Sequence, residues 1–273
     1  MLKLMRADFA RLIRSRSYWI CVILSSAVCI LNIVSGYIAS KNSIQSIATY
    51  LVGDSSNNML FTAVFVSLFI GTDHACGTIR NKLIVGHSRA EIYLSNLVVT
   101  CAAALCMRVI SWSCQLIFGF AAGGKIGMDA GELALDMLIM AMLLCASCSI
   151  FTLMGMLFSS KSTNTVITMV SVFVLVIGCA LIKQFLDQPE MIYDTIITDH
   201  GVEASELYPN PMYVSGALRN ILTAVIDILP GGQAIQLEMR SLHEPKLMPL
   251  WSLGVIAVVT AAGLMLFRKK DLK

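Results

Sequence analysis

Long apolar stretches, each bounded by charged or polar residues, dominate the chain. A helix needs about 20 mostly apolar residues to cross the hydrocarbon layer of a bilayer. Six stretches fit this requirement, and none alternates strictly between apolar and polar residues as a membrane β-barrel strand does. The stretches cover residues 18–39, 59–73, 93–120, 133–158, 164–186 and 247–267. The pattern therefore predicts an all-α integral membrane protein with six transmembrane helices, of which the second is the shortest.

Composition supports the same class. Hydrophobic residues make up 57% of the 273-residue chain and charged residues 14%, with a mean hydropathy of +0.77. Soluble domains carry about 25% charged residues. The formal net charge of +3 is too small to indicate a nucleic-acid partner. We expect one transmembrane domain over 1–273, in contact with lipid, as a multi-pass protein of a cell membrane such as the bacterial plasma membrane.

The distribution of Lys and Arg predicts the orientation. Thirteen lie before the first span, in segments 73–92 and 159–163, and after the last span, whereas five lie in the alternate segments. Cytoplasmic segments carry the excess of Lys and Arg. Both termini are therefore expected in the cytoplasm, with residues 1–17 forming an amphipathic helix at the membrane interface.

Residues 187–246 form the longest segment between spans, and the predicted orientation places them outside the cell. Residues 212–229 could be taken for a seventh span, but Arg219 and Asp227 interrupt them. Their apolar positions recur at helical spacing, which indicates an amphipathic helix at the outer interface or part-way into the protein. A turn at Pro230 and a second short helix over about 233–242 should follow.

Candidate catalytic and metal-binding groups are sparse. The nine cysteines lie in or against the spans, and the pair Cys145 and Cys148 is better explained by helix packing than by a metal or redox site. Residues 119–125 fit the pattern G-x-x-x-x-G-K, but Ile126 stands where a phosphate-binding loop needs Ser or Thr for Mg²⁺. We expect no metal site, no cofactor and no ATP site on this chain, and no enzymatic activity of its own.

Arg108 is an unusual charge within the third span. A lone arginine is costly in the hydrocarbon unless it faces protein or water. We expect Arg108 either to line a transport pathway or pair with a polar group inside the bundle, or to be only structural if the span begins later than drawn.

The segment 73–92 between the second and third spans has a distinctive pattern. An acidic residue is followed by Gly-Thr-hydrophobic-basic, then by a leucine, and finally by Ser-Arg before the next span. We expect a short helix with Ile79, Leu83 and Ile84 on one side and Arg80 and Lys82 on another, a break at Gly86, and a second helix near Ser88. Such a polar elbow at a membrane surface would suit docking to a soluble partner.

This pattern resembles the loop of ATP-binding-cassette exporter permeases of the second type, in which it forms the coupling helix that contacts the nucleotide-binding subunit. The basic amphipathic N-terminus, the six-span layout and the long segment before the last span are also similar to that family. The resemblance implies the same partner contacts at seven positions of this chain. These positions are Asp73, Gly77, Thr78, Arg80, Leu83, Ser88 and Arg89.

The resemblance implies the permease subunit of an ATP-driven exporter that moves an amphipathic substrate, such as a peptide antibiotic, a drug or a lipid-like molecule. Separate cytoplasmic ATPase subunits would bind ATP and Mg²⁺, and two permeases, identical or related, would form a dimer. The segment with Arg219, Asp227 and Pro230 would form the outer gate. The alternatives are an ion-coupled carrier or channel, and a membrane anchor of an immunity or sensor complex that does not transport.

Overall fold

A computed structural model describes residues 1–40, 44, 46–193, 195–198, 201–204 and 207–270. Lys41, Lys273 and parts of the predicted segment 187–246 (residues 194, 199–200 and 205–206) lie outside the described residues. The described part contains six helical segments long and apolar enough to cross a membrane, which confirms the predicted all-α membrane architecture.

The six segments follow the predicted order, with longer bounds. They are α2 (Arg16–Ala39), α3 (Ile47–Val52) together with α4 (Ser55–Ala75), α6 (Arg89–Ala121), α7 (Ala130–Leu157), α8 (Lys161–Leu186) and α11 (Met248–Lys269). The second span therefore differs from the prediction. Its main helix begins at Ser55 instead of Met59, and the short helix α3 precedes it.

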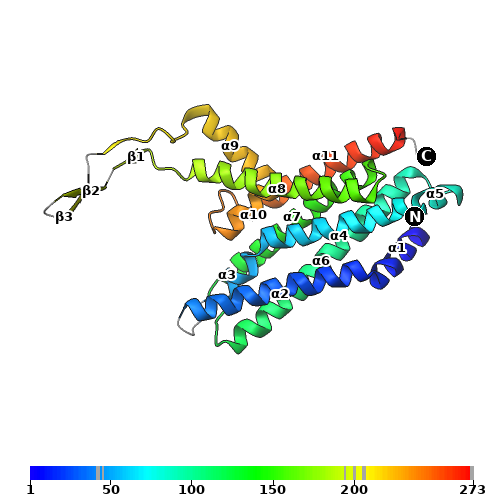
Figure 1. Ribbon diagram of the computed structural model, residues 1–273, viewed down its shortest axis with the longest axis horizontal. Helices are drawn as coiled ribbons and strands as arrows, with labels where there is room; N and C mark the ends of the chain where they lie inside the picture. Colours follow the sequence, from blue (N-terminus) through cyan, green and yellow to red (C-terminus); the bar gives the residue numbers. More distant parts are fainter. Residues whose placement is uncertain (41–43, 45, 194, 199–200, 205–206, 271–273) are drawn as a thin grey trace.

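Both termini lie at one end of the bundle, together with α1 (Leu2–Arg14) and α5 (Thr78–Ile84) (Figure 1). We call this the terminal end. The opposite end, called the far end, holds α3, α9 (Gly216–Ile228) and α10 (Pro230–Glu238). Two short antiparallel pairs extend beyond it: β1 (Met191–Ile192) with β4 (Tyr208–Pro209), and β2 (Thr195–Thr198) with β3 (Gly201–Ala204). The sequence pattern did not predict these strands.

The helices α4 and α7 form the centre of the bundle. In their most apolar windows 61% and 56% of the residues are buried, against 17% in both α8 and α11. The helix α7 packs against α4, α6 and α11, while α4 also packs against α8. The outer faces of α8 and α11 are therefore left for lipid or for another protein.

Small residues let the central helices approach closely. A Cβ atom at Gly155 would lie 3.0 Å from the Ile70 side chain, and one at Gly263 would lie 2.1 Å from the hydroxyl of Tyr93. Tyr93 and Ile70 are completely buried. Glycine at these two places thus fixes the spacing of α7 against α4 and of α11 against α6.

Candidate functional site

The elbow between α4 and α6 is built by two glycines and one helix cap. Gly77 and Gly86 adopt φ angles of 66° and 98°, a region in which glycine has no steric penalty. Between them lies the seven-residue helix α5. The Ser88 hydroxyl accepts a hydrogen bond from the Glu91 amide, and the Glu91 carboxylate accepts one from the Ser88 amide, which forms a capping box at the start of α6. The chain therefore turns twice within a few residues.

One face of α5 is turned away from the bundle. Arg80 and Asn81 are exposed on it, and the adjoining Ile84 and Val85 are 75% and 78% exposed. Ile79 is buried, with Leu83 packed against the same core. The expectation that Ile84 shares a side with Ile79 is therefore wrong, because five helical residues correspond to a rotation of about 140° from the starting face.

The opposite face of the elbow is held by a buried network of ion pairs, which we call the elbow network (Asp8, Arg11, Asp73 and Lys82). The Lys82 ammonium lies 2.7 Å from an oxygen of Asp8 and 3.6 Å from an oxygen of Asp73. The Arg11 guanidinium pairs with Asp73 and lies 3.6 Å from Asp8. The hydroxyl of Ser95 donates a 2.8 Å hydrogen bond to Asp8. The network thus joins α1, α4, α5 and α6.

Burial controls the electrostatics of the elbow network. The side chains of Asp8 and Asp73 are 3% and 1% exposed, and that of Lys82 is 10% exposed. Burial lowers the pKa of Lys82, and the hydrogen bond and charge of Asp8 act in the opposite direction. Burial likewise lowers the pKa of Arg11, again opposed by Asp8. The carboxylate partners therefore offset part of the cost of burying these two cations.

Arg89 also faces the bundle. Its guanidinium donates hydrogen bonds to the carbonyl oxygens of Phe267 at 2.9 Å and Arg268 at 3.1 Å, and to that of Lys270. These oxygens belong to the C-terminal end of α11, where carbonyl groups lack partners in the helix and a positive charge is favourable. Arg89 therefore connects the elbow to the last span.

The seven residues singled out by the sequence pattern thus fall into two groups. Asp73, Leu83 and Arg89 hold the elbow against the helices, whereas Arg80 and Ser88 are exposed, with Gly77 and Thr78 partly exposed. The structure brings all seven together at the terminal end. Sequence reasoning missed Asp8, Arg11 and Lys82 as members of the site, and the expectation that Lys82 shares a side of α5 with Arg80 is wrong, because Lys82 is turned toward the two carboxylates. A signal existed for Asp8, because it lies four residues from both Leu4 and Leu12 and hence on the buried face of α1.

Arg108 is one of the largest fully buried side chains of the described part. It donates a hydrogen bond to the Leu51 carbonyl at the end of α3, and its guanidinium lies 4.9 Å from the Trp112 ring. Arg108 lies 19 positions after Arg89, which corresponds to about 28 Å along α6. It therefore lies toward the far end of the bundle, where it binds a polar group of the interior.

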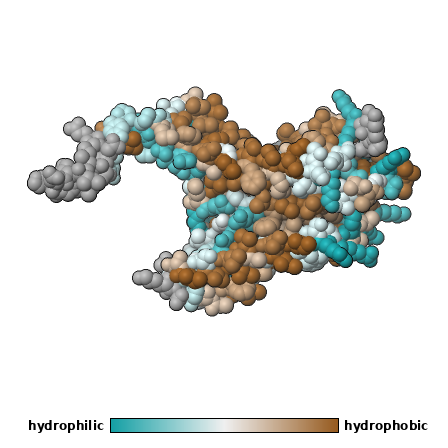
Figure 2. Space-filling model, in the orientation of Figure 1, coloured by the Kyte–Doolittle hydropathy of each residue, from teal (hydrophilic) through white to brown (hydrophobic). Residues whose placement is uncertain are grey.

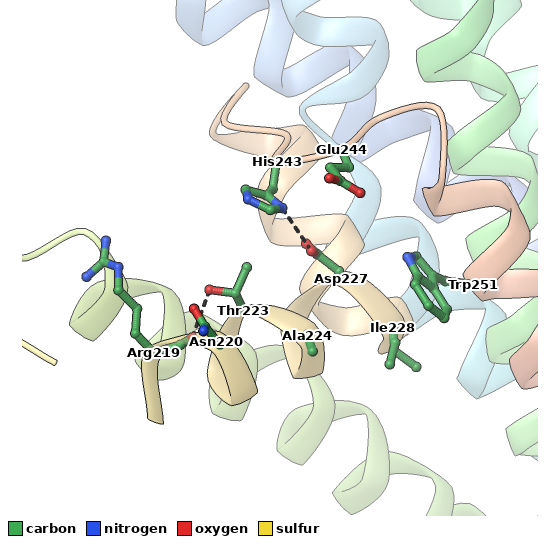
Figure 3. A pocket seen from close by; sticks show the side chains of 9 residues that line it. All are labelled: Arg219, Asn220, Thr223, Ala224, Asp227, Ile228, His243, Glu244 and Trp251. Carbon is green, nitrogen blue, oxygen red and sulfur yellow. Dashed lines mark hydrogen bonds and ion pairs between the residues drawn. The ribbon is translucent and has the colours of Figure 1, made fainter. Parts of the chain in front are cut away.

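Two of the three predicted gate residues, Arg219 and Asp227, line a pocket of about 490 Å³ at the far end, drawn in Figure 3. His243 lies 3.3 Å from a carboxylate oxygen of Asp227, while Arg219 donates to the carbonyl oxygens of Leu186 and Val214. Pro230 is buried at the first turn of α10 and does not line this pocket. Arg219 thus ties α9 to the end of α8.

Further chemistry is limited in the described part of the chain. No group of three His, Cys, Asp or Glu side chains there could hold a metal ion, and each of the nine cysteines is free. The glycine-rich segment at the C-terminal end of α6 is a packing element: Cβ atoms at Gly119, in the last turn, and at Gly124, just after the helix, would lie about 3 Å from Ile47. Such close packing explains these glycines without a phosphate ligand.

The architecture is that of a multi-pass helical membrane protein with a structured elbow at one end and a helical cover at the other. Residues 4–180 match the family described as ABC-2 family transporter protein, and the chain belongs to this family. No curated protein matches the chain. The protein is thus a membrane-spanning permease subunit of an ABC transporter, located in the cell membrane, of a family that associates with ABC ATPase subunits and generally has no ATP site of its own.

Proposed function

We propose that this permease works as an exporter, with its terminal end in the cytoplasm, and that a separate ATPase subunit docks on the exposed face of α5. The observation that carries the proposal is the two-sided elbow. One side presents Arg80, Ile84 and Val85 to solvent, and the other side is fixed to the bundle through the elbow network. A surface that is exposed and apolar, yet rigidly attached, suits the transfer of force from a soluble partner.

The mechanism follows from these attachments. Two ATPase subunits, which bind ATP and Mg²⁺, would close on nucleotide and displace α5. The elbow network would pass this displacement to α1 and α4, and Arg89 would pass it to the end of α11. At the far end, the segment with Arg219, Asp227 and Pro230 would open as the outer gate for an amphipathic substrate.

A dimer of permeases is part of the proposal. The helices α8 and α11 are the least buried spans, and α2 also exposes Ile20, Ile23 and Leu31 at 56%, 64% and 62%. One copy therefore leaves apolar faces on several sides, of which one would contact a second copy or a related permease and the others lipid.

Co-purification tests the docking surface. The tagged chain is purified from its native membrane with its ATPase partner, and Arg80→Glu is compared with Lys269→Glu, which reverses an exposed charge at the same end but outside the elbow. We expect Arg80→Glu to lose most of the partner and Lys269→Glu to retain it. Equal retention in both variants, or full transport without an ATPase, would overturn the proposal.

Reconstituted vesicles test export. With the ATPase partner and ATP, the complex should move substrate to the side opposite the ATPase, and substrate should stimulate ATP hydrolysis. Substrate binding without stimulated hydrolysis would instead indicate the anchor of an immunity or sensor complex.

A further inference from the structure

The break between α3 and α4 places a carboxylate inside the far end of the bundle. Asp54 is the residue before the first turn of α4, and it is 2% exposed. It precedes Asp73 by 19 positions, or about 28 Å along the helix, so it lies close to the far boundary of a hydrocarbon layer of about 30 Å. A charged group at such a position is costly and is a candidate functional site.

The hydrogen-bond donors described at the Asp54 side chain are neutral: three side-chain amides and the thiol of Cys29. The Asn32 side chain donates to one carboxylate oxygen at 2.5 Å, and the Asn57 side chain donates to the same oxygen at 3.4 Å. The Gln115 side chain donates to the other oxygen at 2.7 Å. Within the described part of the chain, Asp54 forms no ion pair. Its charge is therefore solvated by dipoles and not neutralised by direct contact with a cation.

Arg108 is a cation near Asp54, but its guanidinium binds a backbone carbonyl instead of the carboxylate. Its guanidinium binds the Leu51 carbonyl, which also accepts a 3.0 Å hydrogen bond from the Trp112 indole. The Nε and Nη1 atoms of Arg108 are buried without a hydrogen-bond partner, and so is the side-chain oxygen of Gln115. Neither Arg108 nor Gln115 lines the pocket described below. The Gln115 oxygen is an unused acceptor on the residue that binds Asp54, whereas the Arg108 nitrogens are donors and do not bind a cation.

A second carboxyl group lies close to Asp54. The Ser56 amide, in the first turn of α4, donates a 2.6 Å hydrogen bond to Glu238 at the end of α10. Burial raises the pKa of Glu238 above its ordinary value, and the charge of Asp54 also acts to raise it. The second effect is the one that a negative charge has on a neighbouring carboxyl group.

Asp54 lines a pocket that opens to the outside. The pocket has a volume of about 320 Å³ and is lined by Asn32, Thr49, Tyr50, Gly53 and Asp54. Figure 2 shows hydrophilic colours in the recess at the far end near α3 and α10, between hydrophobic surfaces. This size holds a small cationic group and the first atoms of an attached chain. The site therefore offers oxygen acceptors and one carboxylate next to an apolar surface.

We propose that the Asp54 pocket binds the ammonium or guanidinium group of a cationic amphipathic substrate, which names the substrate class of the export proposed above and rests on that function. The ligand's N–H groups would donate to the Asp54 carboxylate and to the oxygens of Thr49 and Asn32. Its apolar part would lie along the exposed hydrophobic faces beside the recess. A neutral or anionic amphipath lacks the charge that the carboxylate attracts.

Binding to the full-length permease in phosphatidylcholine nanodiscs tests the proposal without any ATPase. The chain has three tryptophans, and Trp19→Phe with Trp251→Phe leaves Trp112, beside the pocket, as the fluorescent reporter. The probes are dodecylammonium, dodecylguanidinium and dodecanol. We expect the two cations to bind at least about 10-fold more tightly than dodecanol, as one charge-assisted hydrogen bond provides.

Two pocket variants and two controls decide the outcome. Asp54→Asn should weaken binding of both cations about 10-fold or more. Thr49→Lys places an ammonium on an exposed wall of the pocket and should do the same, so the test stands even if Asp54→Asn fails to fold. Thr49→Gln changes the same position without adding a charge and should weaken cation binding less than Thr49→Lys does. Glu132→Gln, at an exposed acid of the far end outside this pocket, should leave cation binding unchanged.

Equal affinity for dodecanol and the cations, or unchanged cation binding by Thr49→Lys, would overturn the proposal. Neither result would affect the docking of the ATPase on α5, which the Arg80→Glu co-purification tests separately. Conversely, if Arg80→Glu retained the ATPase, the measured cation affinities would still stand. The failure of one proposal can therefore be distinguished from the failure of the other.

Discussion

Replacing Lys82 with methionine tests whether the elbow network holds α5 in place. The Lys82 ammonium makes one 2.7 Å contact with Asp8 and a longer 3.6 Å contact with Asp73, at a side chain that is 10% exposed. A hydrogen bond between charged groups contributes about 1.5–3 kcal/mol, and removal of one partner leaves the other charge buried. Because Arg11 and Ser95 still contact the two carboxylates, we expect a loss near the middle of this range, about 2 kcal/mol.

Hydrogen–deuterium exchange of the amides of α5 measures this loss directly. A local opening free energy reduced by about 2 kcal/mol corresponds to exchange about 30-fold faster. The amides of α7, in the centre of the bundle, should keep their exchange rates. The matched control is Arg80→Met, which removes an exposed cation from the same helix and should change the free energy by less than about 0.5 kcal/mol. The reasoning fails if Lys82→Met exchanges at the wild-type rate or if Arg80→Met accelerates exchange as much.

Three further substitutions probe other contacts. Arg89→Ala removes the hydrogen bonds to the end of α11, so limited proteolysis should cleave near Arg268 faster than in the wild type, and an unchanged cleavage rate would exclude this anchoring role. Gly263→Ala pushes a methyl group into Tyr93 and should lower the free energy of unfolding by about 1–3 kcal/mol in a thermal unfolding assay. Gly178→Ala meets open space and should leave it unchanged, so similar unfolding midpoints for the two variants would contradict the packing argument. Arg108→Leu should lower stability by about 2 kcal/mol through loss of its charged hydrogen bond to the α3 carbonyl, and full transport by this variant after normal insertion would limit Arg108 to a structural role.

The number and type of spans could be predicted from the sequence because each span needs a long apolar run. The start of the second span could not be predicted in this way, because residues 54–58 are polar and end the apolar run. In the structure α4 begins at Ser55, and Asn58 donates a hydrogen bond to the Asp54 carbonyl at 2.7 Å. Polar residues can occupy a helix at this depth when other parts of the protein bind them, and a sequence does not show those partners.

The candidate site was only partly predictable for a similar reason. The elbow pattern located α5, but it did not distinguish Asp73, which is buried in ion pairs, from Arg80, which is exposed. That distinction depends on Arg11, 62 positions earlier in the chain, and therefore on how α1 packs against the elbow. The position of Ile84, in contrast, was predictable from helical periodicity, because five residues turn it about 140° away from Ile79.

The helix α4 joins two of the polar clusters in the described part of the chain. Asp73, near its last turn, belongs to the elbow network. At the other end, Asp54 lines the pocket and Ser56 donates a hydrogen bond to Glu238 of α10. A hydrogen-bonded helix resists compression along its axis, so a displacement of the Asp73 end moves the other end by a similar amount. Because α4 is also packed between α7 and α8, this displacement is confined to sliding along or rotating about its neighbours. In the proposed mechanism, a push on the elbow would therefore reach the Asp54 pocket and the α10 contact together, through one continuous element.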